Sequence, residues 1–145
     1  MAYTKNLTCM SCKTVNKIPE DKLGAGPKCG SCGKPLAAGQ VHDTDLATVI
    51  KCTTNDELPV VVDMWAPWCG PCRTMAPEFD KAAKDLKTVA RFAKINTDKH
   101  QNASQRYNIR GIPALLLFKN GKEIARHAGV MRANELVKWV KTRSM

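Results

Sequence analysis

The sequence lacks any long hydrophobic run. Its longest apolar stretch, residues 112–118, is seven residues long, whereas a membrane-spanning helix needs about 20. The first ten residues also contain no apolar stretch of the length that a signal peptide requires. We therefore expect a cytoplasmic protein and no membrane among its partners.

The sequence also lacks a block of like charge, although its formal net charge is +10. Residues 1–43 hold six lysines and three acidic residues, and residues 44–145 hold 17 basic and ten acidic residues. The basic residues are interleaved with acidic ones, whereas nucleic-acid-binding proteins gather basic side chains on one face. We therefore predict a solvated basic surface and no nucleic-acid partner, and leave acidic protein partners open.

Cysteine, by contrast, is abundant. The chain has seven cysteines, and six of them form three Cys-x-x-Cys pairs. Without a secretion signal, such pairs are more often metal ligands or redox groups than structural disulfides. The seventh, Cys52, lies on the apolar face of a predicted helix, and we interpret it as a small buried hydrophobic residue.

The first 36 residues have too few apolar side chains to form a core, so a metal ion should stabilise them. Their two cysteine pairs are separated by 16 residues, which is the spacing of a four-cysteine zinc ribbon. We predict one Zn²⁺ per chain, because four thiolates select zinc over harder cations, although iron stays open. Two labile disulfides are the alternative. The predicted ligands are Cys9, Cys12, Cys29 and Cys32.

The length of 145 residues suits one ordinary domain and a small appendage. Residues 35–39 contain two alanines and a glycine and indicate a short connection. We therefore expect a zinc ribbon over residues 1–36, a linker over residues 37–40 and a second domain over residues 41–145.

The second domain alternates strand and helix patterns. Expected strands cover residues 41–43, 60–62, 89–96, 114–118 and 123–127, and the last two flank an Asn-Gly turn. Four helices are expected. The first follows residue 45, the second follows Cys72, the third covers residues 98–107 and the fourth lies at the C-terminus. This order predicts an α/β fold with a mixed central sheet and helices on both faces.

The third cysteine pair, Cys69 and Cys72, falls where a predicted strand turns into a helix. A helix N-terminus lowers the pKa of a thiol, so Cys69 should be the nucleophile. Cys72 lies one turn further in and is placed to attack a mixed disulfide formed by Cys69. Half of a zinc site is the alternative, but Pro71 has no N–H to donate to a metal-bound sulfur. The pair therefore predicts dithiol–disulfide exchange.

The sequence Trp68-Cys69-Gly70-Pro71-Cys72 at such a junction resembles the active site of thioredoxins. The resemblance covers residues 41–145, and the ribbon narrows it to the zinc-containing thioredoxin 2 subgroup of bacteria. It implies a thioredoxin-like fold and a redox-active Cys69–Cys72 disulfide. Other matching positions are Asp63, Trp65, Pro77, Lys94, Ile112, Pro113, Gly121 and Gly129.

The resemblance also implies roles around the cysteine pair. Asp63 interrupts an apolar strand, so burial should raise its pKa, and the resemblance assigns it to proton transfer with Cys72, modulated by Lys94. A satisfied polar core residue is the alternative. The family has a cis peptide bond before Pro113, which would offer a backbone edge to substrates, although a proline that merely starts a strand is the alternative. The implied substrate contacts are Trp68, Gly70, Pro71, Ile112, Pro113 and Gly129.

These expectations converge on a monomeric protein-disulfide reductase. Its partners would be disulfide-containing proteins and an NADPH-dependent thioredoxin reductase. The alternative is a binding module or holdase, in which the ribbon recruits a protein or nucleic acid and the second domain is a scaffold.

Overall fold

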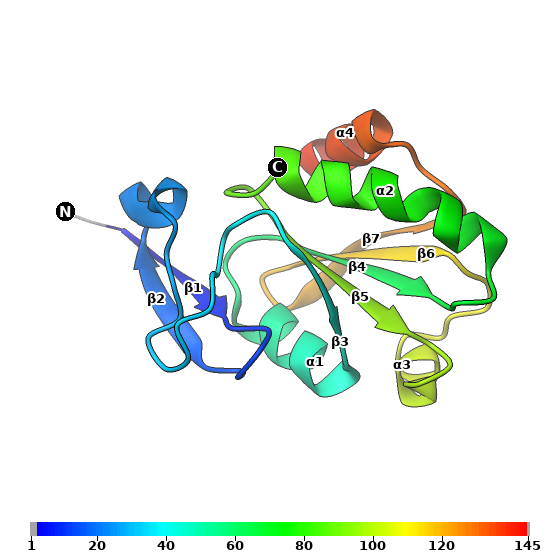
Figure 1. The fold of residues 1–145 in the computed structure, drawn as a ribbon, viewed down its shortest axis with the longest axis horizontal. Helices are drawn as coiled ribbons and strands as arrows, with labels where there is room; N and C mark the ends of the chain where they lie inside the picture. The colour runs from blue at the N-terminus through cyan, green and yellow to red at the C-terminus, as the bar shows by residue number, and fades with distance from the viewer. Residues whose placement is uncertain (1–2, 145) are drawn as a thin grey trace.

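The computed structural model describes residues 3–144 and contains a five-stranded mixed sheet (Figure 1). The strand order is β3-β5-β4-β6-β7, with the first three strands parallel and the last two antiparallel to their neighbours. Helices cover both faces, which confirms the predicted fold class. The strands are β3 (Val41–Thr44), β4 (Val60–Trp65), β5 (Arg91–Asn96), β6 (Ala114–Lys119) and β7 (Lys122–Ala128).

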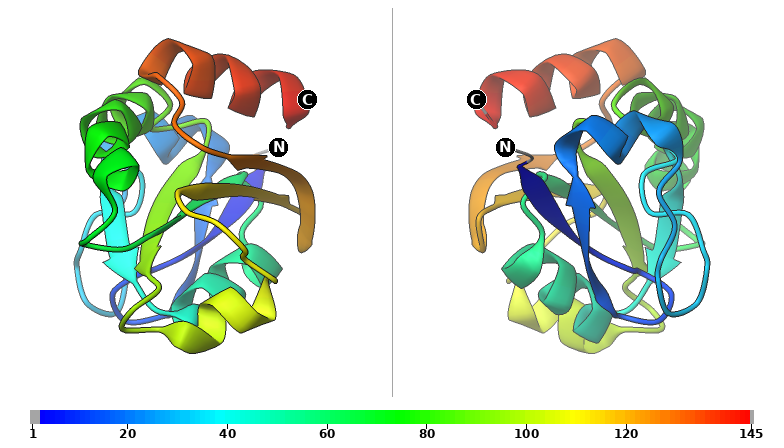
Figure 2. Two further views of the ribbon diagram at one scale, coloured as in Figure 1. Left: turned by 90° about the vertical axis from the view of Figure 1, so that its right-hand side faces the viewer. Right: turned by 90° about the vertical axis from the view of Figure 1, so that its left-hand side faces the viewer.

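Two helices lie on each face of this sheet. α2 (Gly70–Asp85) and α4 (Ala133–Arg143) cover one face, and α1 (Leu46–Asn55) and α3 (Gln101–Arg106) cover the other (Figures 1 and 2). Because both faces of β4 are covered, its residues from Val60 to Met64 are buried, as expected of a central strand. In β4, Asp63 pairs with Lys94 of β5. The strand therefore carries a carboxylate into the core just before the cysteine pair.

The local signals for helix ends are partly confirmed. α1 begins after Asp45, whose side chain accepts a hydrogen bond from the Thr48 amide at 2.9 Å. The helix predicted over residues 98–107 begins later, at Gln101. The reason is that the Asn96 side chain accepts hydrogen bonds from the amides of residues 98 and 99, which holds them in a turn.

The N-terminal segment is a small hairpin unit, whose strands the weak periodicity did not predict. β1 (Thr4–Thr8) pairs with β2 (Val15–Pro19), and the 3₁₀ helix η1 (Glu20–Ala25) follows. Its apolar cluster includes Leu58, which belongs to the predicted second domain. The segment therefore does not have a core of its own. The other buried members of the cluster are Leu7, Cys9, Ile18, Cys29, Leu36 and Ala37.

The residues predicted as a linker pack closely on α2. Gly39 has a φ of +74°, and a Cβ atom at this position would lie 3.0 Å from the Cα of Lys84. The same atom would lie 3.2 Å from the Ala83 carbonyl oxygen. Both the backbone conformation and the space therefore require glycine.

We expect Gly39→Ala to destabilise the protein by about 3 kcal/mol, because it adds a close contact to the cost of a left-handed alanine. Gly121→Ala is the matched control. Gly121 has a φ of +81° with no atom within 4 Å of the added Cβ, so this change should cost about 1 kcal/mol. Denaturant midpoints measure both. Equal losses would show that the contact with α2 is unimportant.

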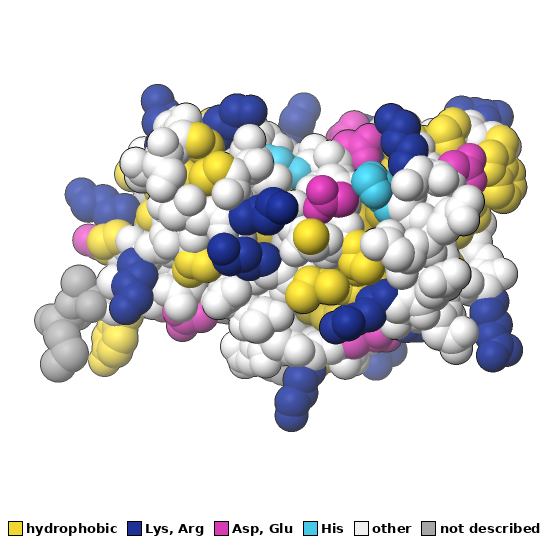
Figure 3. Space-filling view, turned by 90° about the horizontal axis from the view of Figure 1, so that it is seen from below, with side chains coloured by type: hydrophobic (Ala, Val, Ile, Leu, Met, Phe, Trp, Pro, Cys, Tyr) yellow, Lys and Arg dark blue, Asp and Glu magenta, His cyan; other side chains and the backbone are white. Residues whose placement is uncertain are grey.

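One face of the molecule, seen in Figure 3, carries its basic residues in a dispersed pattern. On the face covered by α1 and α3, Lys and Arg side chains are scattered among acidic residues and histidines (Figure 3). Within residues 3–144, no helix combines the length and the hydrophobicity needed to cross a membrane.

Candidate active site and cysteine cluster

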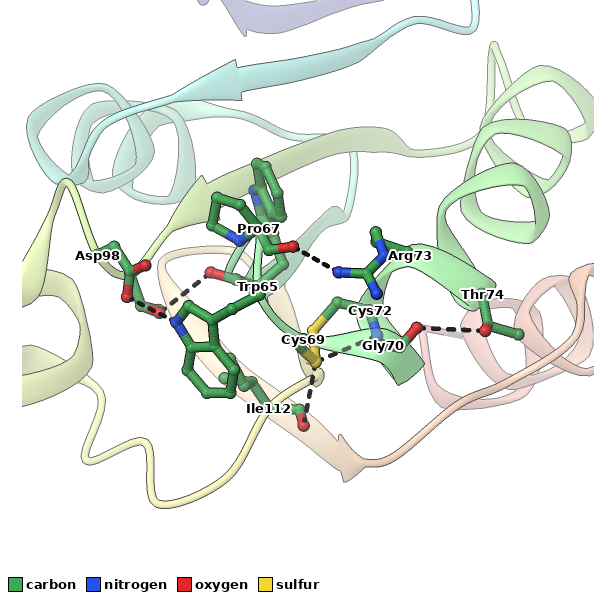
Figure 4. Close-up of a disulfide and its surroundings, with 11 residues drawn as sticks. Trp65, Pro67, Cys69, Gly70, Cys72, Arg73, Thr74, Asp98 and Ile112 are labelled. Carbon is green, nitrogen blue, oxygen red and sulfur yellow. Dashed lines mark hydrogen bonds between the residues drawn. A yellow bond between two sulfur atoms is a disulfide. The ribbon is translucent and has the colours of Figure 1, made fainter.

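Cys69 and Cys72 form a disulfide at the N-terminus of α2, with their Cα atoms 5.2 Å apart (Figure 4). Cys69 is the N-cap residue of this helix, and its sulfur accepts a hydrogen bond from the Cys72 amide at 3.2 Å. Both residues are buried. The pair lies at the strand–helix junction that the sequence predicts, where the amides and the helix dipole favour a thiolate.

A second loop lies directly against the sulfur of Cys69. The Ile112–Pro113 peptide bond is cis, as the resemblance implied, and the Ile112 carbonyl oxygen lies 3.8 Å from Cys69 Sγ (Figure 4). The Gly129 amide donates a hydrogen bond to the Pro113 carbonyl at 2.9 Å. The cis-proline loop therefore lies against the sulfur of Cys69, and the Gly129 segment is hydrogen bonded to that loop.

The predicted substrate contacts form the rim of this site. Trp68 and Pro71 are exposed, Gly70, Ile112 and Gly129 are half-buried, and Pro113 is buried. Five of these six residues are therefore at least partly accessible to a bound peptide.

Asp98 is a site residue that sequence reasoning missed. The exposed Trp68 indole donates a hydrogen bond from Nε1 to Asp98 Oδ1 at 3.1 Å (Figure 4). Arg73 similarly donates from Nη1 to the Pro67 carbonyl at 2.7 Å. No sequence pattern predicts the contact between Trp68 and Asp98, because these residues are 30 positions apart and meet only through the turn between β5 and α3. These contacts orient the tryptophan and the turn before Cys69.

Asp63 lies beneath the cysteine pair and is 3% exposed. Burial raises its pKa to about 7, and the positive charge of Lys94 opposes this shift. Lys94 does not satisfy the buried Asp63 Oδ1, which has no hydrogen-bond partner among residues 3–144. Instead, Lys94 Nζ lies 4.8 Å from the centroid of the Trp65 ring. Asp63 and Cys72 line one cavity of about 60 Å³.

The four N-terminal cysteines gather at the tip of the hairpin unit. Their sulfur atoms all lie within 4.8 Å of one another, and two pairs are 3.5 and 3.6 Å apart. Thiolates placed tetrahedrally about 2.3 Å from zinc are about 3.8 Å apart. Backbone amides of Cys12 and Ser31 donate to two of the sulfurs. The donor set and the spacing therefore fit a structural zinc site.

Comparison with known proteins agrees with both parts of the chain. The thioredoxin family model matches residues 39–142, and the zinc-ribbon model of the thioredoxin 2 N-terminus matches residues 8–34. Thioredoxin C-3 of Corynebacterium nephridii is 39% identical over 137 residues, which are 92% of each chain. Thioredoxin of Rickettsia felis is 42% identical over 86 residues, 59% of this chain and 82% of the relative.

Solved structures show the same fold. A mutant thioredoxin from Halobacterium salinarum aligns with a TM-score of 0.68 and 24% identity, covering 75% of this chain and 95% of that one. Thioredoxin of Malassezia sympodialis aligns with a TM-score of 0.64 and 27% identity, covering 72% and 90%. With its Cys69–Cys72 pair, its sheet and its N-terminal cysteine cluster, this chain belongs to the thioredoxin family of protein-disulfide oxidoreductases.

Proposed function

We propose that Cys69 attacks substrate disulfides and that Cys72 resolves the intermediate. The observation that carries this assignment is the position of Cys69 as the N-cap of α2, where its sulfur accepts the Cys72 amide. A thiolate there is stabilised by that amide and by the helix dipole. Cys72 lies within the first turn and lines the cavity that contains Asp63.

The proposed reaction has two thiolate exchanges. The Cys69 thiolate attacks one substrate sulfur, forms a mixed disulfide and releases the other substrate sulfur as a thiolate. The Cys72 thiolate then attacks the Cys69 sulfur, so that the Cys69–Cys72 disulfide forms and the second substrate thiol leaves. The substrate gains two electrons and the cysteine pair loses two. An NADPH-dependent thioredoxin reductase is the proposed partner that reduces the pair again.

Asp63 is the proposed proton acceptor for Cys72, and Lys94 tunes its pKa. A carboxyl group with a pKa of about 7 can both accept and return a proton near neutral pH. The shared cavity gives the two residues a common environment, and Lys94 also lines it. The alternative of a fully satisfied core carboxylate is weakened by the unpartnered Oδ1 among residues 3–144.

Substrates are proposed to bind along the cis-proline loop. The cis bond at Pro113 and the half-buried Ile112 present backbone beside Cys69, to which an extended peptide can hydrogen bond. Trp68, Gly70, Pro71 and Gly129 would contact its side chains. We propose a monomer that acts in the cytoplasm, where protein thiols stay reduced.

The test of the function is NADPH consumption with thioredoxin reductase and a disulfide-containing protein. We expect turnover that depends on this chain. A holdase or scaffold would instead suppress aggregation of an unfolding protein without consuming NADPH, and that pattern would favour the binding-module alternative.

The N-terminal unit is proposed to bind one Zn²⁺ through Cys9, Cys12, Cys29 and Cys32. Residues 1–36, 37–40 and 41–145 remain our proposed division of the chain. The bound ion would supply folding free energy rather than redox chemistry, because zinc has no accessible second oxidation state.

We expect about one zinc ion per wild-type chain and a loss of stoichiometric zinc in Cys29→Ser, because three thiolates leave one tetrahedral position unfilled. Metal analysis after dialysis measures this. The matched control is Cys72→Ser, since Cys72 lies outside the cluster, at the start of α2. A wild-type chain without zinc, or full zinc in Cys29→Ser, would contradict the assignment.

A further inference from the structure

The segment from Leu7 to Met10 joins the ribbon to the rest of the fold. Its four residues are between 0 and 6% exposed. Leu7 packs in the cluster that includes Leu58, and Met10 packs in the apolar cluster between α1, α3 and the sheet. The proposed zinc ligand Cys9 therefore directly follows β1, is itself buried, and lies between residues that pack on the thioredoxin domain.

Thr8 is held by two buried charged side chains of the thioredoxin domain. Its amide donates a hydrogen bond to Asp56 Oδ1 at 2.6 Å, and its carbonyl accepts one from Arg91 Nη1 at 2.6 Å. Arg91 Nη1 also lies 2.6 Å from Asp56 Oδ2. Asp56 directly follows α1, and Arg91 is the first residue of β5. The two side chains therefore hydrogen bond to both backbone polar groups of Thr8.

These hydrogen bonds to Thr8 are buried rather than exposed at the surface. The side chains of Asp56 and Arg91 are 0 and 3% exposed, and Thr8 is fully buried. Buried charges are costly unless they are paired and hydrogen bonded. Thr8 supplies one donor and one acceptor, and Arg91 Nη2 has no hydrogen-bond partner among residues 3–144. Two further hydrogen bonds join Asn6 to Glu57, at 2.9 and 3.0 Å. We call Asp56, Arg91 and the Thr8 backbone the clamp.

The clamp lies next to the cysteine cluster in the chain. With the amide and carbonyl of Thr8 fixed, the direction in which the chain enters Cys9 is fixed as well. On the other side of Cys9, Met10 is anchored in the thioredoxin core. The second knuckle differs, since the Gly30 amide donates its hydrogen bond to Oδ1 of Asn16, which belongs to the ribbon itself. Contacts with the other domain therefore flank Cys9 on both sides, through Thr8 and Met10.

We propose that Asp56 and Arg91 are positioning residues for the metal site, which hold Thr8 so that Cys9 presents its sulfur to the other three cysteines. The inference rests on the proposed zinc site. In this proposal, two side chains of the thioredoxin domain help to position a zinc ligand of the ribbon. Because coupling between two equilibria is reciprocal, zinc in turn strengthens the clamp and stabilises the start of β5.

The first experiment compares the zinc affinity of the full chain and its Arg91→Met variant by competition with a chromophoric chelator. Losing a group that orients a metal ligand weakens metal binding about 10- to 100-fold, and we expect a decrease in that range. Arg91→Lys should recover part of the affinity, because an ammonium group can still pair with Asp56 and the Thr8 carbonyl. Unchanged affinity in a folded Arg91→Met variant would overturn the proposal.

Two control variants separate positioning from general loss of stability. Leu136→Ala opens a cavity between α4 and the sheet, where Leu136 is fully buried. Arg126→Met removes an exposed ion pair with Glu123 on β7. Both should keep wild-type zinc affinity. A decrease in Leu136→Ala as large as that in Arg91→Met would show that affinity follows global stability, and would overturn the clamp.

If Arg91→Met does not fold, the same competition is made with Asp56→Asn, which keeps the side-chain shape. Hydrogen exchange of the wild-type Thr8 amide gives an independent readout. We expect strong protection with zinc and at least 10-fold faster exchange after chelation; exchange at the unprotected rate with zinc bound would overturn the clamp. A wild-type chain that binds no zinc overturns the zinc site itself, whereas zinc-binding wild type with an unaffected variant overturns only the clamp.

Discussion

Cys69→Ser should reduce NADPH-linked turnover to the rate measured without the protein. A serine hydroxyl is not ionised near neutral pH and cannot attack a disulfide, so no mixed disulfide forms. Cys72→Ser should also stop turnover, but for a different reason. Its Cys69 thiolate still attacks, and the substrate stays attached because no resolving thiol remains.

The two variants are distinguished by mass spectrometry of the protein after incubation with a disulfide substrate. Cys72→Ser should gain the mass of one substrate molecule, and reductant should remove it. Cys69→Ser should gain none. Cys52→Ala serves as the control, because Cys52 is buried and lies outside the redox pair. If Cys69→Ser accumulated the adduct and Cys72→Ser did not, the two roles would be exchanged.

The active site was predictable because its signals are local. The β-branched run 60–62 begins β4, Cys69 of the following cysteine pair is the N-cap of α2, and Asp45 caps α1. The burial of Asp63 also follows from its place in an apolar strand. The cis bond before Pro113 was implied only by the resemblance, since trans and cis prolines look alike in a sequence.

The contacts that join the two parts of the chain were not predictable. Thr8 lies 48 residues from Asp56 and 83 residues from Arg91. An arginine in a sequence normally indicates solvent exposure, and only the fold shows that Arg91 is buried against a carboxylate. The hairpin β1–β2 was missed for a related reason, because its strands depend on a shared core and a metal site rather than on clean alternation.

Asp63→Asn should slow the second exchange step by about 10²- to 10⁴-fold, the usual contribution of one acid–base group. The first step should be unaffected, because Cys69 is activated by the helix N-terminus. Single-turnover kinetics separates formation of the mixed disulfide from its resolution. Lys94→Met should move the pH profile of resolution upward, because the Lys94 charge lowers the pKa of Asp63. Equal slowing of both steps would contradict the proposed role.

The same carboxyl group should make stability depend on pH. Its pKa is about 7 in the folded protein, whereas the ordinary value for an aspartate is 3.8, so the folded state holds the proton more tightly and ionisation destabilises it. Stability should therefore decrease as pH rises from about 4 to about 7, by about 4 kcal/mol. Asp63→Asn cannot ionise, so unfolding midpoints of the oxidised proteins should diverge in its favour between about pH 4 and about pH 7 and stay apart above neutral pH. A difference that is constant with pH, together with unchanged resolution kinetics, would make Asp63 a structural residue.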